Sequence, residues 1–196
     1  MDAPEQSSAE NAAGTIYTIG HSTRTFDDFL AVLKSHAIEA IADVRLIPKS
    51  RRHPQFADSF LAVELPRAGI EYLSFKSLGG LRRPMKDSPN TGWRNESFRG
   101  YADFLQTPAF ETALGHLIDR ARLQRVATMC AEAVPWRCHR SLISDALVVR
   151  GWRVLDIFDE KKVVPHALTS FARVDGLRIT YPPNGAPEMM EPGLFS

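Results

Sequence analysis

Residues 14–44 read GTIYTIGHSTRTFDDFLAVLKSHAIEAIADV, and this stretch decides the fold. Residues 14–20 are β-branched and aromatic and end in glycine, a pattern that predicts a buried strand. Residues 25–36 carry apolar side chains at helical spacing behind Thr25, a typical N-cap, and acidic residues occupy the first turn, where the helix dipole favours negative charge. Residues 38–44 predict a second strand. This order of strand, helix and strand favours two parallel strands of one sheet.

The rest of the chain continues the alternation. Strands are predicted at 70–75, 125–132, 152–158 and 177–181, and helices at 56–67, 98–105, 108–123 and 141–150. Pro66 must end or bend the first of these helices, whereas Pro108 suits the start of its helix behind Thr107. The pattern predicts an α/β fold, a three-layer sandwich in which helices cover both faces of a mostly parallel sheet. We expect one domain over residues 14–182, between a disordered lead at 1–13 and a flexible tail at 183–196.

Composition places the chain among ordinary globular proteins. Its 196 residues are 44% hydrophobic, enough for one domain with a core, and the formal net charge is +1. This balance gives no global argument for nucleic acid or for a membrane, and no apolar run approaches the ~20 residues of a membrane-spanning helix. The chain has only two cysteines and no signal-peptide pattern, so we expect a reducing, cytoplasmic location.

Polar residues follow three of the predicted strands. In a parallel sheet these strand ends share one edge, and ligands bind beyond that edge. The residues concerned are His21 and Ser22 after the first strand, Asp43 and Arg45 where the second strand ends, Cys130 and Glu132 at the end of 125–132, and Cys138, His139 and Arg140 at the start of the next helix. Their convergence is the main argument for a functional site.

Each candidate has a chemical and a structural interpretation. Glu132 and Asp43 suit acid–base catalysis, and a salt bridge is the alternative for each carboxylate. Because Glu132 follows a buried strand, we expect its side chain to be desolvated. Cys138 lies at a helix start beside basic residues, which predicts a nucleophilic or redox thiol, or with Arg140 an anion site. A small buried cysteine is the alternative.

Histidine and cysteine together allow further interpretations. His21 and His139 complete the catalytic candidates. Cys130, Cys138 and His139, joined by His21, also suit a metal ion, but the cysteines are eight positions apart, a looser spacing than the close pairs of structural zinc sites. A regulatory disulfide is another alternative. No metal ligand and no cofactor is assigned from the sequence.

Basic residues concentrate between residues 45 and 99. This segment holds eleven Lys and Arg against five Asp and Glu, a local excess of +6. Arginines near aromatic rings suit contacts with phosphates and bases, and a solvated basic face is the alternative. The candidate binding residues are Ser22, Arg45, Lys49, Ser50, Arg51, Tyr72, Gly79, Gly80, Arg82, Arg83 and Arg140. Residues 76–97 form a long loop of a kind that is usually functional or mobile.

The commonest motifs of α/β enzymes are missing from the sequence. No GxGxxG follows the first strand, so the dinucleotide fingerprint is absent. No GxxxxGK[ST], HExxH or GxSxG occurs either. These absences exclude the most frequent functions of such a domain.

Several short motifs nevertheless occur in a specific order. They are Thr18-Ile-Gly-His-Ser22, Asp43-Val-Arg45 with Pro48 and Ser50-Arg51, Gly69-Ile-Glu-Tyr72, Leu78-Gly-Gly80, Phe98 with Tyr101-Ala102, and Met129-Cys-Ala-Glu132 with Cys138-His-Arg140. Together they resemble the Domain of Unknown Function 488 family over roughly residues 15–160. The resemblance implies a Rossmann-like single domain and the same motif residues, but no substrate. One departure is Asp156, where members often carry histidine. If that histidine is catalytic in relatives, Asp156 must replace it or the role is lost.

These features lead to one functional hypothesis and two alternatives. We expect an enzyme that acts on a phosphate-bearing ligand, a nucleotide or a nucleic acid, by a hydrolytic or glycosidic reaction. The arginines would hold phosphate, and Glu132 or Asp43 would activate water. The alternatives are a non-catalytic module that binds nucleic acid or nucleotides, and a thiol or metal site built on Cys130 and Cys138. The sequence alone leaves open whether the chain is an enzyme.

Overall fold

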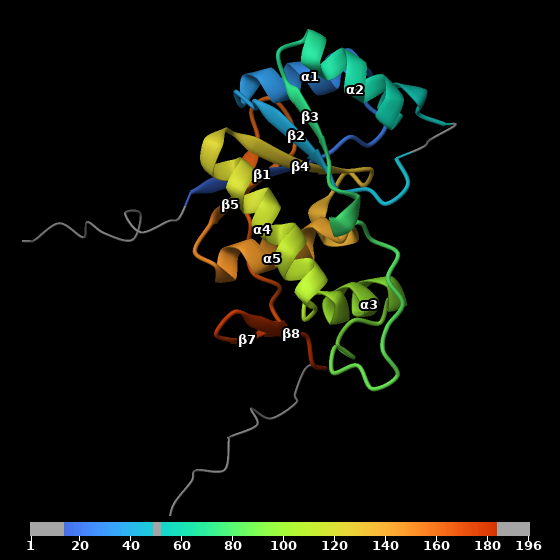
Figure 1. Ribbon diagram of the computed structural model, residues 1–196, viewed down its shortest axis with the longest axis vertical. Helices are drawn as coiled ribbons and strands as arrows, with labels where there is room; N and C mark the ends of the chain where they lie inside the picture. Colours follow the sequence, from blue (N-terminus) through green and yellow to red (C-terminus); the bar gives the residue numbers. More distant parts are fainter. Residues whose placement is uncertain (1–13, 49–51, 184–196) are drawn as a thin grey trace, which may run out of the picture.

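The computed structural model describes residues 14–48 and 52–183, whose centre is one twisted sheet (Figure 1). Its strand order is β3-β2-β4-β1-β5-β6. The strands are β1 (Thr15–Gly20), β2 (Ala40–Asp43), β3 (Glu71–Ser74), β4 (Val126–Cys130), β5 (Arg153–Ile157) and β6 (Val163–Pro165). Neighbouring strands pair in parallel, except that β6 runs antiparallel to β5. The predicted α/β fold with a mostly parallel, Rossmann-like sheet is therefore confirmed.

Helices cover both faces of the sheet. They are α1 (Phe26–Ser35), α2 (Asp58–Arg67), α3 (Glu96–Phe104), α4 (Pro108–Leu123) and α5 (Arg140–Val149), with short 3-10 turns at Pro54–Phe56, Lys76–Leu78 and Pro135–Arg137. One apolar core lies under α1 and α2, and the other lies under α3, α4 and α5. Figure 1 shows α1 and α2 at one end of the molecule and the hairpin of β7 (Arg173–Asp175) and β8 (Arg178–Thr180) at the other. Within the described ranges, no helix is long and apolar enough to cross a membrane.

Local sequence explains where the helices begin and end. The Thr25 hydroxyl accepts a hydrogen bond from the Asp28 backbone N–H, and the Thr107 hydroxyl caps α4 in the same way. Pro66 lies in the last turn of α2, which ends at the next residue, as predicted. Gly151 follows α5 with φ of +80°, a left-handed conformation that favours glycine.

Two strands were not predicted from the sequence. β6 and β7 have three residues each, all of them exposed, so neither shows the apolar alternation that marks a half-buried strand. Both form by pairing with a neighbour, β5 and β8 respectively. The predicted lead at 1–13 and all but the first residue of the predicted tail lie outside the described residues, so the domain limits stay predictions.

The long loop at 76–97 is anchored by one buried carboxylate. Asp103 of α3 accepts hydrogen bonds from the Met85 backbone N–H (2.8 Å), the Ser88 hydroxyl (2.6 Å) and the Asn90 side-chain amide (2.7 Å). The Asn90 side-chain oxygen accepts a hydrogen bond from the Tyr181 backbone N–H at 2.8 Å. Hydrogen bonds to Asp103 and to the Tyr181 backbone therefore hold this loop in place without an apolar period.

A buried histidine joins β5, α5 and the segment that follows β6. His166 Nδ1 lies 3.2 Å from Asp156 Oδ2, and its Nε2 lies 3.0 Å from Asp145 Oδ1. Asp145 also accepts a hydrogen bond from the Tyr181 hydroxyl at 2.9 Å. Burial alone would lower the pKa of His166, but hydrogen bonds and the charges of the two carboxylates outweigh it and raise the pKa to about 9. His166 is therefore a buried cation at neutral pH.

We expect the free energy of unfolding to fall as the pH rises through about 9. The pKa of His166 is higher in the folded chain than the 6.5 of an ordinary histidine, so the folded state holds this proton more tightly. The stabilisation is complete below about pH 6.5 and is lost above about pH 9, by up to about 3 kcal/mol. Urea unfolding of the wild type and of His166→Gln checks this. The stability difference between the two proteins must shrink at high pH, and a constant difference contradicts the prediction.

Candidate active site

The segments that follow β1 and β4 lie side by side at the carboxyl edge of the sheet. The His21 backbone N–H donates to the Cys130 carbonyl and the Ser22 N–H donates to the Ala131 carbonyl, both at 2.9 Å. Ser22 adopts φ of +53°, which turns the chain away from the strand direction. β2 lies on the other side of β4, so the polar segments after the three strands meet at one edge, as the sequence predicts.

A cleft of about 420 Å³ opens at this edge. Its volume falls within the usual range for small-molecule sites and suits a ligand of nucleotide size. The residues predicted from the sequence that line it are Arg45, Gly80, Cys130, Glu132, Cys138 and His139. The structure therefore brings both cysteines, one histidine and one candidate acid–base carboxylate to a single cavity.

Two thiols and an imidazole form a cluster in this cleft. The sulfur atoms of Cys130 and Cys138 and one ring nitrogen of His139 all lie within 4.8 Å of one another. Cys138 Sγ is 3.7 Å from His139 Nδ1, while His139 Nε2 is 3.0 Å from the Val44 carbonyl oxygen. A carbonyl only accepts, so Nε2 carries the proton of the neutral ring and Nδ1 offers its lone pair toward the thiol. Both cysteines are free thiols.

The two thiols differ in acidity. The interaction with Cys130 lowers the pKa of Cys138 well below its ordinary value, and the charges near it, among them Arg140, act in the same direction against the effect of burial. The same interaction, together with burial, raises the pKa of Cys130. Cys138 is therefore the thiol that loses its proton first.

Arg140 places a buried positive charge behind the cluster. Its side chain is 1% exposed and donates to the Thr18 hydroxyl (2.6 Å) and to the Glu132 carbonyl (2.7 Å). In the part of the chain that the structure describes, no carboxylate forms an ion pair with it. An isolated buried cation is costly, so the nearby thiols are the groups in a position to balance its charge.

Asp43 holds Arg45 in a fixed orientation beside the cleft. Arg45 Nε and Nη2 reach the two carboxylate oxygens of Asp43 at 2.8 and 2.6 Å, and the Tyr72 hydroxyl donates to Asp43 Oδ2 at 2.8 Å. Burial alone would lower the pKa of Arg45, but the Asp43 carboxylate outweighs it and raises the pKa. The salt bridge that is the alternative interpretation of Asp43 is therefore present, and it orders Arg45 and Tyr72 rather than leaving the carboxylate free.

His21 completes this buried network. Its Nδ1–H donates to the Ser22 carbonyl at 2.9 Å, and its Nε2 accepts from Arg45 Nη1 at 3.2 Å. The ring stacks on Phe56 with centroids 4.2 Å apart. Burial lowers the pKa of His21 to about 4, and the charge of Arg45 acts in the same direction. His21 is thus neutral at physiological pH, and both of its nitrogens are engaged.

Glu132 and Arg137 are the two charged side chains that remain available in the cleft. Both line it and both are exposed, so the desolvation expected of Glu132 is not found. The reason is that Glu132 lies beyond the end of β4, where the chain leaves the sheet. Among the described residues, neither side chain makes a hydrogen bond or an ion pair. Both are therefore free to contact a ligand.

A comparison with protein families covers most of the residues of this site. The family model described as "Domain of unknown function DUF488" matches residues 25–147, well over half of the chain. The chain belongs to the DUF488 family. No curated protein and no solved structure matches it. The matched range contains Asp43, Arg45, Cys138 and Arg140, whereas His21 and Asp156 fall outside it.

Asp156 is the position at which this DUF488 chain departs from the expected histidine. Its Oδ2 lies 3.2 Å from His166 Nδ1, while its Oδ1 is buried and has no hydrogen-bond partner among the residues that the structure describes. A histidine is therefore present beside this position, but it comes from a residue ten places further along the chain. Asp156 does not line the cleft.

The residues that the sequence predicts for phosphate binding do not all lie in the cleft of this DUF488 chain. Lys49, Ser50 and Arg51 lie outside the described residues. Arg82 donates to the Gly79 and Ser77 carbonyls at 3.1 and 3.0 Å, and its guanidinium stacks over a phenylalanine ring of α3. Arg83 is exposed but does not line the cleft. Two of the five N–H donors of Arg82 are therefore used by carbonyls of its own loop, and its contact with phosphate stays a prediction.

The paired glycines allow their loop to pack against the site. A Cβ on residue 79 would lie 2.8 Å from Leu46 Cβ, and a Cβ on residue 80 would lie 3.0 Å from His139 Nδ1. Gly79 and Gly80 therefore allow this close approach, and their role in binding a ligand stays a prediction. Three further residues line the cleft that were not predicted from the sequence as site residues, namely Ile47, Phe98 and Arg137. The only signal for Arg137 was its place beside Cys138.

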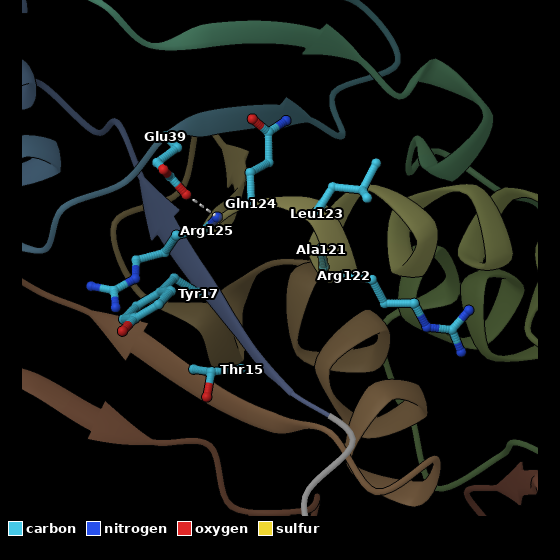
Figure 2. Close-up of a pocket in the computed structure, with 8 residues that line it drawn as sticks. All are labelled: Thr15, Tyr17, Glu39, Ala121, Arg122, Leu123, Gln124 and Arg125. Carbon is cyan, nitrogen blue, oxygen red and sulfur yellow. Dashed lines mark hydrogen bonds between the residues drawn. The ribbon is translucent and has the colours of Figure 1, made fainter.

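A second depression, of about 350 Å³, lies at the opposite edge of the sheet (Figure 2). Its polar groups serve the structure itself. Glu39 accepts a hydrogen bond from the Arg125 backbone N–H at 2.6 Å, and the Arg125 guanidinium lies over the Tyr17 ring. Ligands of parallel sheets bind at the carboxyl ends of the strands, whereas this depression lies at the amino end of β1. The 420 Å³ cleft at the carboxyl edge is therefore the stronger candidate for a ligand site.

Proposed function

We propose that the protein is a hydrolytic enzyme that acts in the 420 Å³ cleft on a phosphate-bearing ligand of nucleotide size. The observation that carries the proposal is the pairing of free charges in this cavity. Glu132 and Arg137 both line it, and neither has a partner among the residues that the structure describes. A site that only binds phosphate needs a positively charged side chain such as Arg137. A carboxylate such as Glu132, free beside it, can in addition transfer a proton during a reaction.

The residues have separate roles in this proposal. Arg137 contacts the phosphate, since a guanidinium offers a planar fork of donors to its oxygens. Arg45 adds positive charge at the cleft wall, held in place by Asp43. Glu132 takes a proton from the attacking water or delivers one to the leaving group. Ile47 and Phe98 give the cleft an apolar portion for the part of the ligand beyond the phosphate.

Replacing Arg137 and Glu132 one at a time separates ligand binding from catalytic turnover. We expect nucleotides to raise the melting temperature of the wild type. Arg137→Ala should weaken their binding about 10- to 100-fold, because it removes a charge-assisted hydrogen bond. Glu132→Gln should keep the affinity and lower kcat by about 100-fold or more. The measurement is a thermal-shift screen of mono-, di- and triphosphates with and without added zinc, followed by assays for released phosphate and released base.

An exposed arginine elsewhere provides the matched control. Arg67 is 70% exposed and forms only an ion pair within α2, so Arg67→Ala should leave nucleotide affinity unchanged. Equal losses in Arg67→Ala and Arg137→Ala would mean that net charge, not the cleft, attracts the ligand. Tight nucleotide binding without turnover would identify a binding module instead. The absence of any response to phosphate compounds would overturn the proposal.

A further inference from the structure

We propose that Cys130, Cys138 and His139 bind a Zn²⁺ ion through both sulfur atoms and Nδ1, with a water molecule as the fourth ligand on the cleft side. The binding site stands on its own geometry. The catalytic use of the ion rests on the proposed function. The eight-residue spacing of the cysteines argued against a metal in the sequence, but the chain folds back between them and brings the ligand atoms together.

The distances suit a tetrahedral ion. Zinc bonds of about 2.3 Å to sulfur and about 2.1 Å to nitrogen place neighbouring ligand atoms roughly 3.5–3.8 Å apart. Cys138 Sγ and His139 Nδ1 are 3.7 Å apart, so this pair already has the required separation. The whole cluster lies within 4.8 Å, so any remaining pair needs to close by at most about 1 Å. Rotation of a cysteine side chain covers such a distance without moving the backbone.

The outer contacts of His139 are those of a metal ligand. Its Nε2–H donates to the Val44 carbonyl at 3.0 Å, which fixes the ring and leaves Nδ1 as the free donor atom. Histidines that bind metals commonly direct their second nitrogen at a backbone carbonyl or a carboxylate in this way. The Tyr101 ring lies against His139 with centroids 4.9 Å apart and limits its rotation. The imidazole is therefore oriented before any ion arrives.

The number of ligands favours a reactive ion over a structural one. Structural zinc sites are closed by four protein ligands, whereas catalytic sites use three and keep one position for water or substrate. In the described ranges, the cluster consists of these three residues, and all three line the cleft. An ion bound here is therefore accessible to whatever enters the cavity.

A zinc-bound water would explain the position of Glu132. This residue follows Cys130 by two positions and lines the same cavity without being part of the cluster. Zinc makes its water a stronger acid, and the Glu132 carboxylate can accept the released proton. The oxygen of this water would bond to the electrophilic atom of the substrate, the bond to the leaving group would break, and Glu132 would pass the proton to that group. Zinc deaminases divide the work in this manner between the ion and a glutamate that is not a ligand.

Cobalt titration of the full-length, reduced and chelator-treated protein tests the site. The chain contains only two cysteines, so any thiolate-to-cobalt charge-transfer band must come from Cys130 or Cys138. We expect one Co²⁺ per chain, a tetrahedral spectrum and displacement by Zn²⁺. Azide should change the spectrum by replacing the water. Cys130→Ser, Cys138→Ser and His139→Gln should each weaken cobalt binding by more than the roughly 10- to 100-fold that loss of an outer contact costs.

One variant controls for the loss of a histidine, and a pair of glycine variants tests the packing against His139. His116 is an exposed histidine on α4, so His116→Gln should bind cobalt like the wild type. Gly80→Ala places a methyl group 3.0 Å from His139 Nδ1 and should weaken binding, whereas Gly115→Ala meets nothing within 4 Å and should not. A wild-type spectrum without a thiolate band overturns the site, whatever the variants do. A spectrum that azide leaves unchanged overturns the water ligand.

The two proposals fail in different ways. Stoichiometric cobalt bound by the three ligands, with no phosphate compound turned over, leaves the metal site standing and removes the proposed function. Turnover that survives complete removal of metal, with free thiols counted by alkylation, leaves the hydrolytic function standing and removes the catalytic use of the ion, while the cobalt titration alone decides the binding site.

Discussion

Asp43→Asn should destabilise the protein by about 3–5 kcal/mol, because it strands a buried positive charge. The Asp43 side chain is 1% exposed and accepts from Arg45 Nε, Arg45 Nη2, the Arg45 backbone N–H and the Tyr72 hydroxyl. Asparagine has nearly the same shape but no charge, and its amide group directs donors at donors. Arg45 is itself only 7% exposed, so water cannot replace the lost partner. Urea unfolding of the two proteins measures the difference.

Two further variants separate the charge from the hydrogen bonds. Tyr72→Phe removes one hydrogen bond to Asp43 and should lower the free energy of unfolding by at most about 3 kcal/mol. The double variant Asp43→Asn with Arg45→Met removes the stranded cation and should recover part of the loss, since a buried pair replaced by uncharged groups is often nearly neutral. If Asp43→Asn costs no more than Tyr72→Phe, the charge of Arg45 is solvated and the buried ion pair does not hold the cleft wall.

Gly20→Ala should also cost about 3–5 kcal/mol, for a steric reason. A Cβ at this position would lie 1.8 Å from the Glu132 carbonyl oxygen and 3.0 Å from Ala133 Cα. Both atoms belong to the backbone, so rotation of a side chain cannot relieve the contact. The segment after β4 would have to move away, and the hydrogen bond that the Glu132 carbonyl accepts from Arg140 would be weakened with it. The junction between β1 and β4 would open at the site.

Thermal and urea unfolding of Gly20→Ala and Gly115→Ala provide the comparison. Gly115 lies in α4 with nothing within 4 Å of its ideal Cβ, so alanine there should stabilise the helix by about 0.5–1 kcal/mol. The same chemical change should therefore have opposite signs at the two positions. A Gly20→Ala protein as stable as the wild type would show that the chain after β4 does not approach β1 this closely.

Much of the fold follows from local patterns. Helical spacing together with the caps Thr25 and Thr107 places α1 and α4, and Pro108 marks the first residue of α4. Continuous apolar runs mark β1, β2 and β4 because parallel strands are covered on both faces. β6 and β7 lack such a signal, since three exposed residues pair only because a neighbouring strand offers its edge. Sequence periodicity cannot report a strand whose side chains are not buried.

The candidate site, like the fold, is only partly predictable from the sequence. The sequence places Cys138, His139 and Glu132 near one edge, because residues that follow parallel strands must meet there. The sequence does not show which of the two candidate carboxylates is left without an ion-pair partner. Asp43 is the last residue of β2 and Glu132 follows the neighbouring β4, yet Asp43 is buried against Arg45 and Glu132 lies exposed in the cleft. Only the packing around each strand end decides this, because burial and partners come from residues distant in sequence.

Local patterns in the sequence predict the α/β class, the helix limits to within about two residues and the polar edge, because propensity, capping and apolar period are properties of neighbouring residues. Tertiary structure alone decided the closeness of Cys130, Cys138 and His139, the use of Arg82 within its own loop, and the pairing of His166 with two aspartates. Distances between donor atoms, and the water that burial removes, depend on how remote segments pack. No local pattern encodes them.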